Sequence, residues 1–160
     1  MSISSKIVQN YIEAAMAVHN WQQQGLEVVF TNGCFDLLHK GHILYLEEAS
    51  QQGHKLIVAI NADKSVSKLK GKHRPIKDED NRSLIMAALS FVDLVVIFHE
   101  ETPKELIDMV TPDVLVKGGD WKPSQIVGSE HVINNGGKVL SLQFVDGYST
   151  TALEEKIKKA

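Results

Sequence analysis

Short apolar runs alternate with amphipathic stretches along most of the chain. Five runs rich in β-branched and aliphatic residues predict strands, at 27–32, 55–61, 93–98, 113–118 and 138–144. Two stretches within them, 57–60 and 94–97, are apolar without alternation, which is typical of strands covered on both faces. The pattern therefore predicts a parallel sheet with helices on both sides.

Helical patterns fill the intervals between these runs. They predict helices at 43–52, 80–89, 103–110, 125–134 and 149–159. Alternating strand and helix with short connections predicts a single Rossmann-like, doubly wound α/β domain. Its sheet should have five strands, mainly parallel, with right-handed crossovers and helices on both faces.

The first residues predict a separate feature. Residues 1–24 read as an amphipathic helix, and Glu13 interrupts any continuous apolar core of the kind a secretory signal requires. We therefore expect a helical extension over 1–25 and the main domain over 26–160. The extension is expected to cover the domain or to contribute to a dimer interface.

Composition excludes several classes of protein. The chain has 160 residues, a net charge of −3 and one cysteine, Cys34. The small acidic balance argues against a general nucleic-acid binder, and no apolar stretch is long enough to cross a membrane. A lone cysteine excludes an internal disulfide framework, so we expect a cytoplasmic protein.

Two histidines three residues apart follow the first predicted strand. His39 and His42 would share one face of the next helix, and Gly41 between them allows a ligand close to the backbone. The start of a helix also favours phosphate. The alternative is one capping and one packed histidine. A metal site lacks further ligands, because Cys34 is isolated and no His-Glu-x-x-His pattern occurs.

Cys34 and Asp36, in the same turn, each have two possible interpretations. Cys34 is a nucleophile candidate beside His39, or a small residue packed at the strand end, which we favour. Asp36 either caps the turn or binds a ribose or an attacking group. The strand is not followed by Gly-x-Gly-x-x-Gly, and the chain has no P-loop pattern. Dinucleotide and ordinary P-loop sites are thereby disfavoured.

Three further segments follow predicted strands, where ligands bind in doubly wound sheets. The segment 64–76 collects the basic residues Lys68, Lys70, Lys72, His73 and Arg74. It reads as a mobile lid over a triphosphate or as a solvated face, with Gly71 as hinge. Arg82 is a phosphate ligand or a helix-face ion pair. Two glycines with Asp120 at 116–121 suit a base or ribose, or form an ordinary turn. Gly147 with three hydroxyls at 149–151 suits a second phosphate, although one hydroxyl is expected to serve as a helix N-cap.

Together these motifs resemble the cytidylyltransferase-like nucleotidyltransferases. The segments NGCFDLLHKGH, KGGDW and DGYSTT carry the general resemblance. NADKSVSKLKGKHRPI, PDVLVKGGDW, IVGSEHV and GGKVLS are similar to the heptose 1-phosphate adenylyltransferases in particular. The likeness extends over 26–158 and makes 26–160 the nucleotidyltransferase domain.

The resemblance implies an activity and its partners. Such enzymes transfer AMP from ATP to D-glycero-β-D-manno-heptose 1-phosphate, giving ADP-heptose and pyrophosphate for the lipopolysaccharide core. Mg²⁺ would arrive on the ATP phosphates, with no metal held by protein ligands. A homodimer is implied. Many members are fused to a sugar kinase, and this chain resembles the stand-alone form.

The resemblance also implies roles for individual residues. The catalytic residues would be His39, His42 and Lys70. The nucleotide would be bound by Asn32, Gly33, Cys34, Phe35, Gly41, Lys68, Arg74, Arg82, Lys117, Gly118, Asp120, Trp121, Gly147, Ser149, Thr150 and Thr151. The sugar phosphate would be bound by Asp36, Asn61 and Asp63.

Two positions depart from the related glycerol phosphate cytidylyltransferases. Those enzymes carry an arginine where this chain has Ser90, and Arg-Thr where it has Phe144-Val145. A different base and acceptor would explain both changes. The alternatives are a cytidylyltransferase for a polyol or sugar phosphate, a non-catalytic nucleotide sensor and a redox Rossmann domain.

Overall fold

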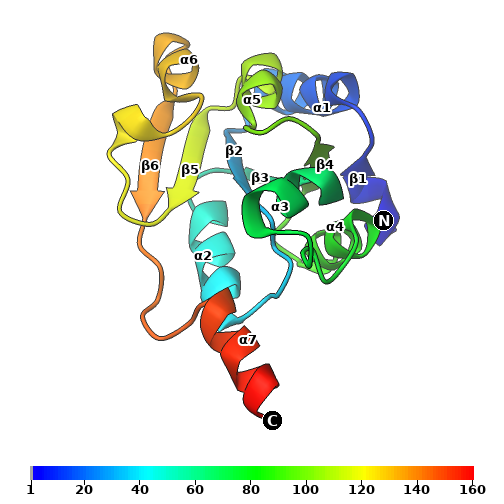
Figure 1. Ribbon diagram of the computed structural model, residues 1–160. Helices are drawn as coiled ribbons and strands as arrows, with labels where there is room; N and C mark the ends of the chain where they lie inside the picture. The colour runs from blue at the N-terminus through cyan, green and yellow to red at the C-terminus, as the bar shows by residue number, and fades with distance from the viewer. Residues whose placement is uncertain (1) are drawn as a thin grey trace.

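The computed structural model describes residues 2–160 and contains one six-stranded sheet in which every pair of strands is parallel (Figure 1). The strand order is β1-β4-β3-β2-β5-β6. The strands are β1 (Ile7–Val8), β2 (Val28–Gly33), β3 (Lys55–Asn61), β4 (Leu94–Phe98), β5 (Val114–Gly118) and β6 (Lys138–Leu142). The predicted doubly wound α/β class is confirmed, with six strands in place of five.

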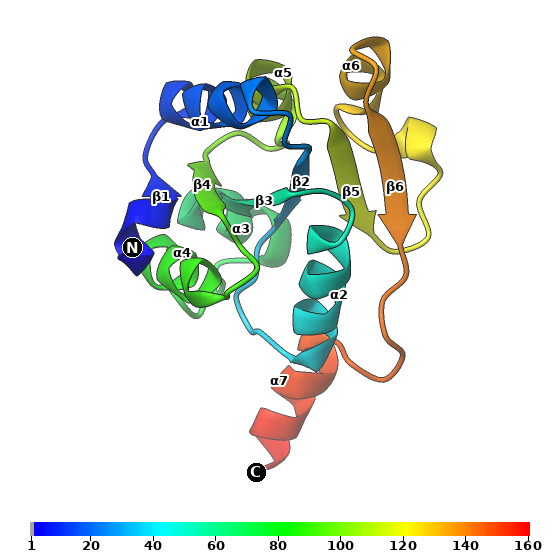
Figure 2. The same cartoon turned by 180° about the vertical axis from the view of Figure 1, so that it is seen from behind.

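Helices cover both faces of this sheet, as the view from behind also shows (Figure 2). The helices are α1 (Tyr11–Gln23), α2 (Lys40–Ser50), α3 (Asp63–Lys70), α4 (Glu79–Ala88), α5 (Lys104–Val110), α6 (Ser129–Asn134) and α7 (Thr150–Lys159), with short 3-10 turns at Ile3–Lys6 and Pro123–Gln125. One apolar cluster joins the sheet to α2 and α4, and the other joins it to α1, α5 and α6.

Alternate side chains of the central strands divide between these two clusters. In β3, Leu56 and Val58 pack toward α2 and α4, whereas Ile57 packs toward α1 and α5. All three are almost completely buried, which is why this strand is apolar at successive positions. The sheet is therefore a rigid platform between two helical layers.

The N-terminal segment differs from the predicted helix. Helix α1 begins at Tyr11 because the side chain of Asn10 accepts a hydrogen bond from the Glu13 N–H at 2.9 Å, an N-cap. Before it, Ile7–Val8 forms the edge strand β1 beside β4. The prediction of a helix over 1–24 is thus wrong for residues 2–10, and Met1 lies outside the described part.

The basic segment 64–76 begins with a helix that the sequence pattern did not predict. Its first half forms α3, with Ser65 and Val66 buried, and the helix ends at Gly71, where φ is +100°. Glycine adopts this backbone conformation without the steric cost that a Cβ would add. Lys68 and Lys70 therefore lie in the last turn of a helix.

The strand order reverses at β2, which has β3 on one side and β5 on the other. This reversal is the switch point at which ligands bind in doubly wound sheets. Asn32 and Gly33 end β2 there, beside Lys117 and Gly118 at the end of β5. Among residues 2–160, no helix has the length and apolar character needed to cross a membrane.

Candidate active site

The turn from β2 to α2 carries the two histidines into the switch-point crevice. Phe35 adopts a left-handed backbone conformation with φ of 47°, which is uncommon for a residue with a side chain. His39 occupies the N-cap position of α2, and its carbonyl accepts the His42 N–H at 3.0 Å. The turn thus places both imidazoles at the first turn of the helix.

The two imidazole rings stack on each other. Their centroids are 3.8 Å apart with 24° between the planes, and Phe35 packs edge-on against His42. A Cβ at Gly41 would come within 3.0 Å of the His39 ring and 3.1 Å of the Tyr148 Cβ. A side chain at this position would therefore press on the His39 ring and on Tyr148.

The surroundings keep both histidines uncharged near neutral pH. Burial, the neighbouring His39 and Lys70 together lower the pKa of His42 to about 4, and burial lowers the pKa of His39. The Nδ1 atoms of both rings are buried without a hydrogen-bond partner among residues 2–160. Neither ring is committed to a protein group at that atom, so hydrogen-bonding capacity remains for a ligand.

We expect the half-buried His42 to make the protein less stable as the pH falls. The folded-state pKa lies below the unfolded value of about 6.5, so the unfolded state takes up a proton first. The free energy of unfolding should therefore decrease as pH falls from about 6.5 to about 4. Urea titrations at several pH values check this, and His42→Asn should flatten the dependence. An equally steep dependence in His42→Asn would contradict it.

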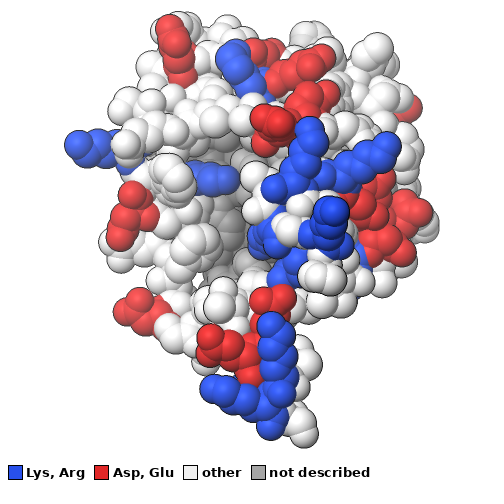
Figure 3. All heavy atoms as spheres, viewed as in Figure 1, with Lys and Arg blue, Asp and Glu red and all other residues white. Residues whose placement is uncertain are grey.

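A cavity of about 180 Å³ lies beside His42. Its lining comes from the ends of β2 and β5, the β2–α2 turn, α2, α3, the β6–α7 connection and the start of α7. The residues are Asn32, Gly33, Cys34, Phe35, Asp36, His42, Tyr45, Lys70, Lys117, Gly118, Phe144 and Thr150. Figure 3 shows this part of the surface hollowed, with Lys and Arg side chains gathered over α3 along one side.

Positive groups converge on this cavity from three elements. Lys70 ends α3 and Lys117 lies near the end of β5. Thr150 begins α7, whose N-terminus carries partial positive charge, while the hydroxyl of Ser149 accepts the Ala152 N–H at 3.1 Å as the cap. Two lysines, a helix N-terminus and an imidazole suit a polyphosphate.

Several predicted nucleotide ligands lie elsewhere. Lys68 pairs with Glu101 at 3.6 Å on the surface beyond this cavity. Asp120, Gly147 and Thr151 are exposed and are not part of its lining. Of the basic residues predicted to reach phosphates from the 64–76 segment, Lys70 is the one that faces the cavity.

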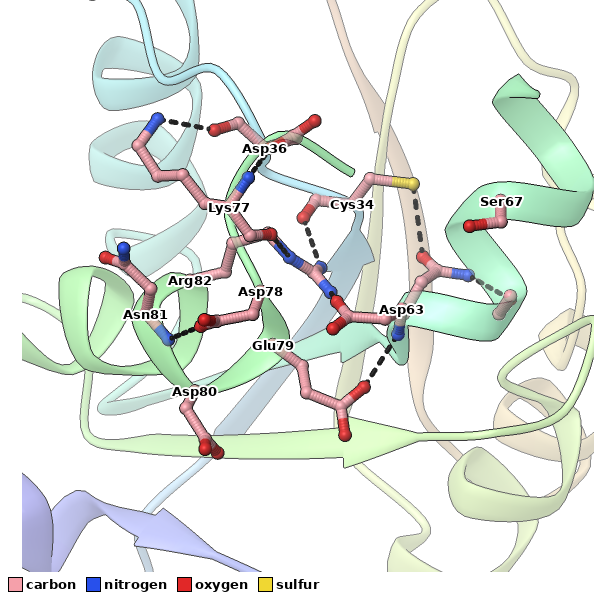
Figure 4. Close-up of polar contacts among 12 residues, drawn as sticks. Cys34, Asp36, Asp63, Ser67, Lys77, Asp78, Glu79, Asp80, Asn81 and Arg82 are labelled. Atoms are coloured by element: carbon pink, nitrogen blue, oxygen red, sulfur yellow. Dashed lines mark hydrogen bonds and ion pairs between the residues drawn. The ribbon is translucent and has the colours of Figure 1, made fainter. Parts of the chain in front are cut away.

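Arg82 has an internal role in the structure. The side chain is completely buried and donates to the carbonyl oxygens of Lys77 and Cys34 and to the Asp63 carboxylate at 2.7 Å (Figure 4). The Asp63 carboxylate pairs with this arginine, and the Asp63 backbone N–H donates to the Glu79 carboxylate at 2.6 Å. The structure thus favours the ion-pair interpretation. Arg82 supports the β2–α2 turn through its hydrogen bond to the Cys34 carbonyl oxygen, and Asp63 holds Arg82.

Asp36 ties the histidine turn to the segment after α3. Its carboxylate accepts the N–H groups of Ile76 and Lys77, each at 2.8 Å, and the Arg74 Nε at 2.6 Å. Burial alone would raise the pKa of Asp36, but these donors outweigh it and hold the pKa below its ordinary value. Asp36 therefore serves as an anchor, and no oxygen of its carboxylate is left without a donor.

Arg74 extends the same network to α7. Its Nη1 lies 2.5 Å from the Glu154 carboxylate, and the arginine is buried although Glu154 is partly exposed. None of the residues of α7 is fully buried. This ion pair is therefore a principal polar contact that holds α7, and with it Thr150, against the site.

We expect Glu154→Ala to loosen α7. Without the ion pair, amide hydrogen exchange over 150–159 should be several-fold faster, consistent with roughly 1 kcal/mol for a partly exposed pair. Glu155→Ala is the matched control, because Glu155 is exposed and forms no ion pair among residues 2–160. Hydrogen-exchange mass spectrometry checks this. Equal exchange in both variants would show that Arg74 does not hold the helix.

Cys34 and Asn61 meet at the back of the crevice. The thiol donates to the Asn61 Oδ1 at 3.7 Å, and the Asn61 Nδ2 donates to the Ser65 Oγ at 3.1 Å. Burial raises the pKa of the Cys34 thiol, which keeps it protonated. This favours the packed interpretation of Cys34 over the nucleophile.

Sequence reasoning did not assign two aromatic residues, Tyr45 and Phe144, to this cavity. The hydroxyl groups of Tyr45 and Thr31 share a hydrogen bond of 2.6 Å between their oxygens. Burial raises the pKa of the Tyr45 hydroxyl to about 12. Tyr45 lies one helical turn after His42, a spacing that could have indicated it. Phe144 packs directly on Gly118, where a Cβ would collide with its ring. Phe144 from the β6–α7 connection therefore narrows this cavity.

Comparison with known proteins agrees with this geometry. A model of the cytidylyltransferase-like family matches residues 30–156, which include the histidine turn, both lysines and the start of α7. The chain belongs to the cytidylyltransferase-like family. This membership covers the elements that form the cavity.

The curated relatives of this cytidylyltransferase-like chain are much longer. The bifunctional protein HldE of Hydrogenovibrio crunogenus is 55% identical over 139 residues, 87% of this chain and 29% of the relative. The HldE protein of Magnetococcus marinus is 47% identical over 150 residues, 94% of this chain and 31% of the relative. The chain thus spans less than a third of the length of these relatives.

Solved structures share the fold. The lipopolysaccharide core biosynthesis protein of Thermoplasma volcanium has a TM-score of 0.63 at 27% identity, over 78% of this chain and all of that one. A pantoate-beta-alanine ligase of Francisella tularensis, at 15% identity, has a TM-score of 0.58 over 95% of this chain and 76% of its own. The second likeness concerns the fold alone.

Proposed function

We propose that this chain transfers AMP from ATP to D-glycero-β-D-manno-heptose 1-phosphate, giving ADP-heptose and pyrophosphate. The observation that carries the proposal is the stacked, uncharged histidine pair beside a cavity with two lysines and the N-terminus of α7. Identity of about half to HldE proteins and the likeness to a lipopolysaccharide core biosynthesis protein support the heptose as acceptor.

The chemistry needs alignment and charge neutralisation more than a strong base. A sugar phosphate is already anionic near pH 7, so its oxygen can attack the α-phosphorus while the bond to the pyrophosphate oxygen breaks. His39 and His42 would donate hydrogen bonds to the triphosphate. Lys70 and the N-terminus of α7 would stabilise the charge that builds on the departing pyrophosphate.

Mg²⁺ fits this scheme as part of the nucleotide. Among residues 2–160 no group of three or more His, Cys, Asp or Glu side chains is arranged to hold a metal ion. The carboxylate lining the cavity, Asp36, is already bound to Arg74 and two backbone N–H groups. The donor set therefore suits Mg²⁺ that enters bound to ATP and supplies further charge neutralisation on its phosphates.

The proposal also covers the compartment, the oligomeric state and the binding partners of the chain. We expect a cytoplasmic homodimer that uses ATP and heptose 1-phosphate as partners and binds neither nucleic acid nor membrane. Size-exclusion chromatography with light scattering tests the dimer. A monomer at micromolar concentration would contradict it.

Pyrophosphate release tests the activity. ATP and CTP are each combined with heptose 1-phosphate and with glycerol 3-phosphate, in the presence of Mg²⁺. We expect release with ATP and the heptose only. Release with CTP and glycerol 3-phosphate would overturn the choice of base and acceptor in favour of a polyol cytidylyltransferase, and absence of release in all four would favour a nucleotide sensor.

A further inference from the structure

Residues 143–149, the β6–α7 connection, form a strap between two fixed ends. At one end, the Gly119 N–H donates to the carbonyl oxygen of Leu142, the last residue of β6, at 2.8 Å. At the other end, the ion pair of Glu154 ties α7 to the body of the domain. All seven residues of the strap are exposed, and within residues 2–160 the backbone of its first six makes no hydrogen bond to another backbone group. Segments of this kind open more easily than the elements that they join.

The ring of Phe144 holds the strap against the cavity beside His42. A Cβ at Gly118 would collide with this ring, so the ring lies directly on the glycine at the end of β5. Its centroid is also 5.6 Å from that of Tyr45 on α2, within the range of aromatic contacts. Phe144 therefore bridges β5 and α2, which are two walls of the same cavity.

This apolar ring lies among groups that suit a polyphosphate. The lining that contains Phe144 also contains Lys70, Lys117 and Thr150. The cavity has about 180 Å³, whereas sites that enclose drug-sized ligands usually have roughly 300–1,000 Å³. A phenyl ring offers no hydrogen bond to phosphate oxygens. A triphosphate would therefore gain both room and access to these donors if the ring moved out.

The environment of Lys117 fits a closed cavity. Burial lowers the pKa of its amino group, because removal from water disfavours the charged form. The closed arrangement thus opposes the positive charge that a phosphate ligand needs. Opening of the cavity to water would remove part of this penalty.

A second aromatic contact holds the other end of the strap. The Tyr148 ring lies 5.6 Å from the Lys40 Nζ at the start of α2, within cation–π range. Gly147, just before it, has φ of +85° and nothing within 4 Å of its Cβ position. Glycine turns there without steric cost. The strap thus has one aromatic contact near each end and a glycine between them.

We propose that the strap closes this cavity in the free protein, with Phe144 as the plug, and that it moves off Gly118 when a nucleoside triphosphate enters. The inference rests on the proposed function, because it takes the cavity beside His42 as the triphosphate site. A site that is open for only a fraction of the time binds its ligand with an affinity reduced by that fraction. The contact of Phe144 with Gly118 is therefore autoinhibitory for nucleotide binding.

Fluorine NMR tests the movement without requiring turnover. The chain has five phenylalanines, and Phe144→Leu identifies the Phe144 signal in protein labelled with fluorophenylalanine. Addition of Mg²⁺ and a non-hydrolysable ATP analogue should move this signal toward that of a solvent-exposed ring. The signal of Phe91, which packs on an apolar cluster outside the cavity lining, should stay in place. Saturable binding of the analogue with an unmoved Phe144 signal would overturn the proposal.

Calorimetric titration of the same analogue gives a second, independent readout. Phe144→Ala should bind it about three- to tenfold more tightly, as for loss of one aromatic contact that favours the closed state. The matched control is Val145→Ala, an exposed neighbour on the strap outside the cavity lining, which should leave the Kd unchanged. Unchanged or weaker binding in Phe144→Ala would overturn the plug, and weaker binding would make Phe144 a contact of the bound nucleotide.

The two experiments separate the inference from the proposed function. Movement of Phe144 and tighter binding in Phe144→Ala, without turnover of heptose 1-phosphate, would support the strap and overturn the proposed function. Turnover with an unmoved Phe144 would overturn the inference alone. No binding of the triphosphate in any variant would overturn both.

Discussion

His42→Ala is expected to lower kcat for pyrophosphate release by about a hundred- to thousandfold, or roughly 3–4 kcal/mol, with the fold retained. The imidazole lines the cavity at the first turn of α2, where the proposed mechanism places the phosphate charge of the transition state. Removing one preorganised donor from such a site costs about this much. Steady-state kinetics with saturating Mg·ATP and heptose 1-phosphate measure the loss.

His19→Ala is the matched control for this prediction. His19 is an exposed residue of α1, and its ring binds Gln23 on the surface. We expect its removal to leave kcat within about twofold, since solvent-exposed substitutions far from a site act weakly. Circular dichroism should show that both variants are folded. Near-normal turnover of a folded His42→Ala protein would exclude the histidine from the reaction.

Asp36→Ala is expected to destabilise the protein by about 3–5 kcal/mol. The carboxylate is completely buried and holds Arg74 at 2.6 Å as well as two backbone N–H groups. Without it, a buried guanidinium and two N–H donors lose their partner, which is far costlier than loss of a surface pair. Urea denaturation at pH 7 measures the free energy of unfolding.

The pH dependence of this loss has a defined sign. Because the pKa of Asp36 is lowered in the folded state, its stabilisation is complete above the unfolded value of about 3.9 and decreases as pH falls below it. Asp146→Ala, in the exposed β6–α7 connection, should change stability by less than about 0.5 kcal/mol. If Asp36→Ala were as stable as this control, Asp36 would be free for a substrate.

The main architecture could be predicted because the strands carry their own signal. The continuous apolar character of β3 and β4 follows from burial on both faces, and a parallel sheet follows from the helices between them. The histidine turn was also predictable, because a strand, a glycine and a helix start occur in a row. These features depend on residues that are close in sequence.

The missed elements depend on contacts that sequence patterns do not contain. Strand β1 has only two residues, and its existence rests on pairing with β4, nearly ninety positions away. Helix α3 is rich in lysine and buries only Ser65 and Val66, so it lacks an apolar stripe. A short polar helix at the end of a strand cannot be distinguished from a loop by periodicity.

In the candidate site, too, some features follow from local sequence and others depend on contacts between distant segments. The approach of His42, Lys117 and Thr150 to one cavity follows from the rule that the carboxyl ends of parallel strands form the binding edge. The internal roles of Arg82 and Asp36 do not follow from the sequence, because each depends on a partner from a distant segment. A charged residue near a phosphate site is ambiguous until its burial and partners are known.

The transfer of label from the α-phosphate of ATP is the most direct test of adenylyl transfer. ATP labelled at the α-phosphorus is incubated with heptose 1-phosphate and Mg²⁺, and the products are separated. The account predicts that the label appears in ADP-heptose, in step with the release of unlabelled pyrophosphate. Label that stays in ADP or ATP, with no labelled sugar nucleotide, would contradict the assignment of this chain as an adenylyltransferase.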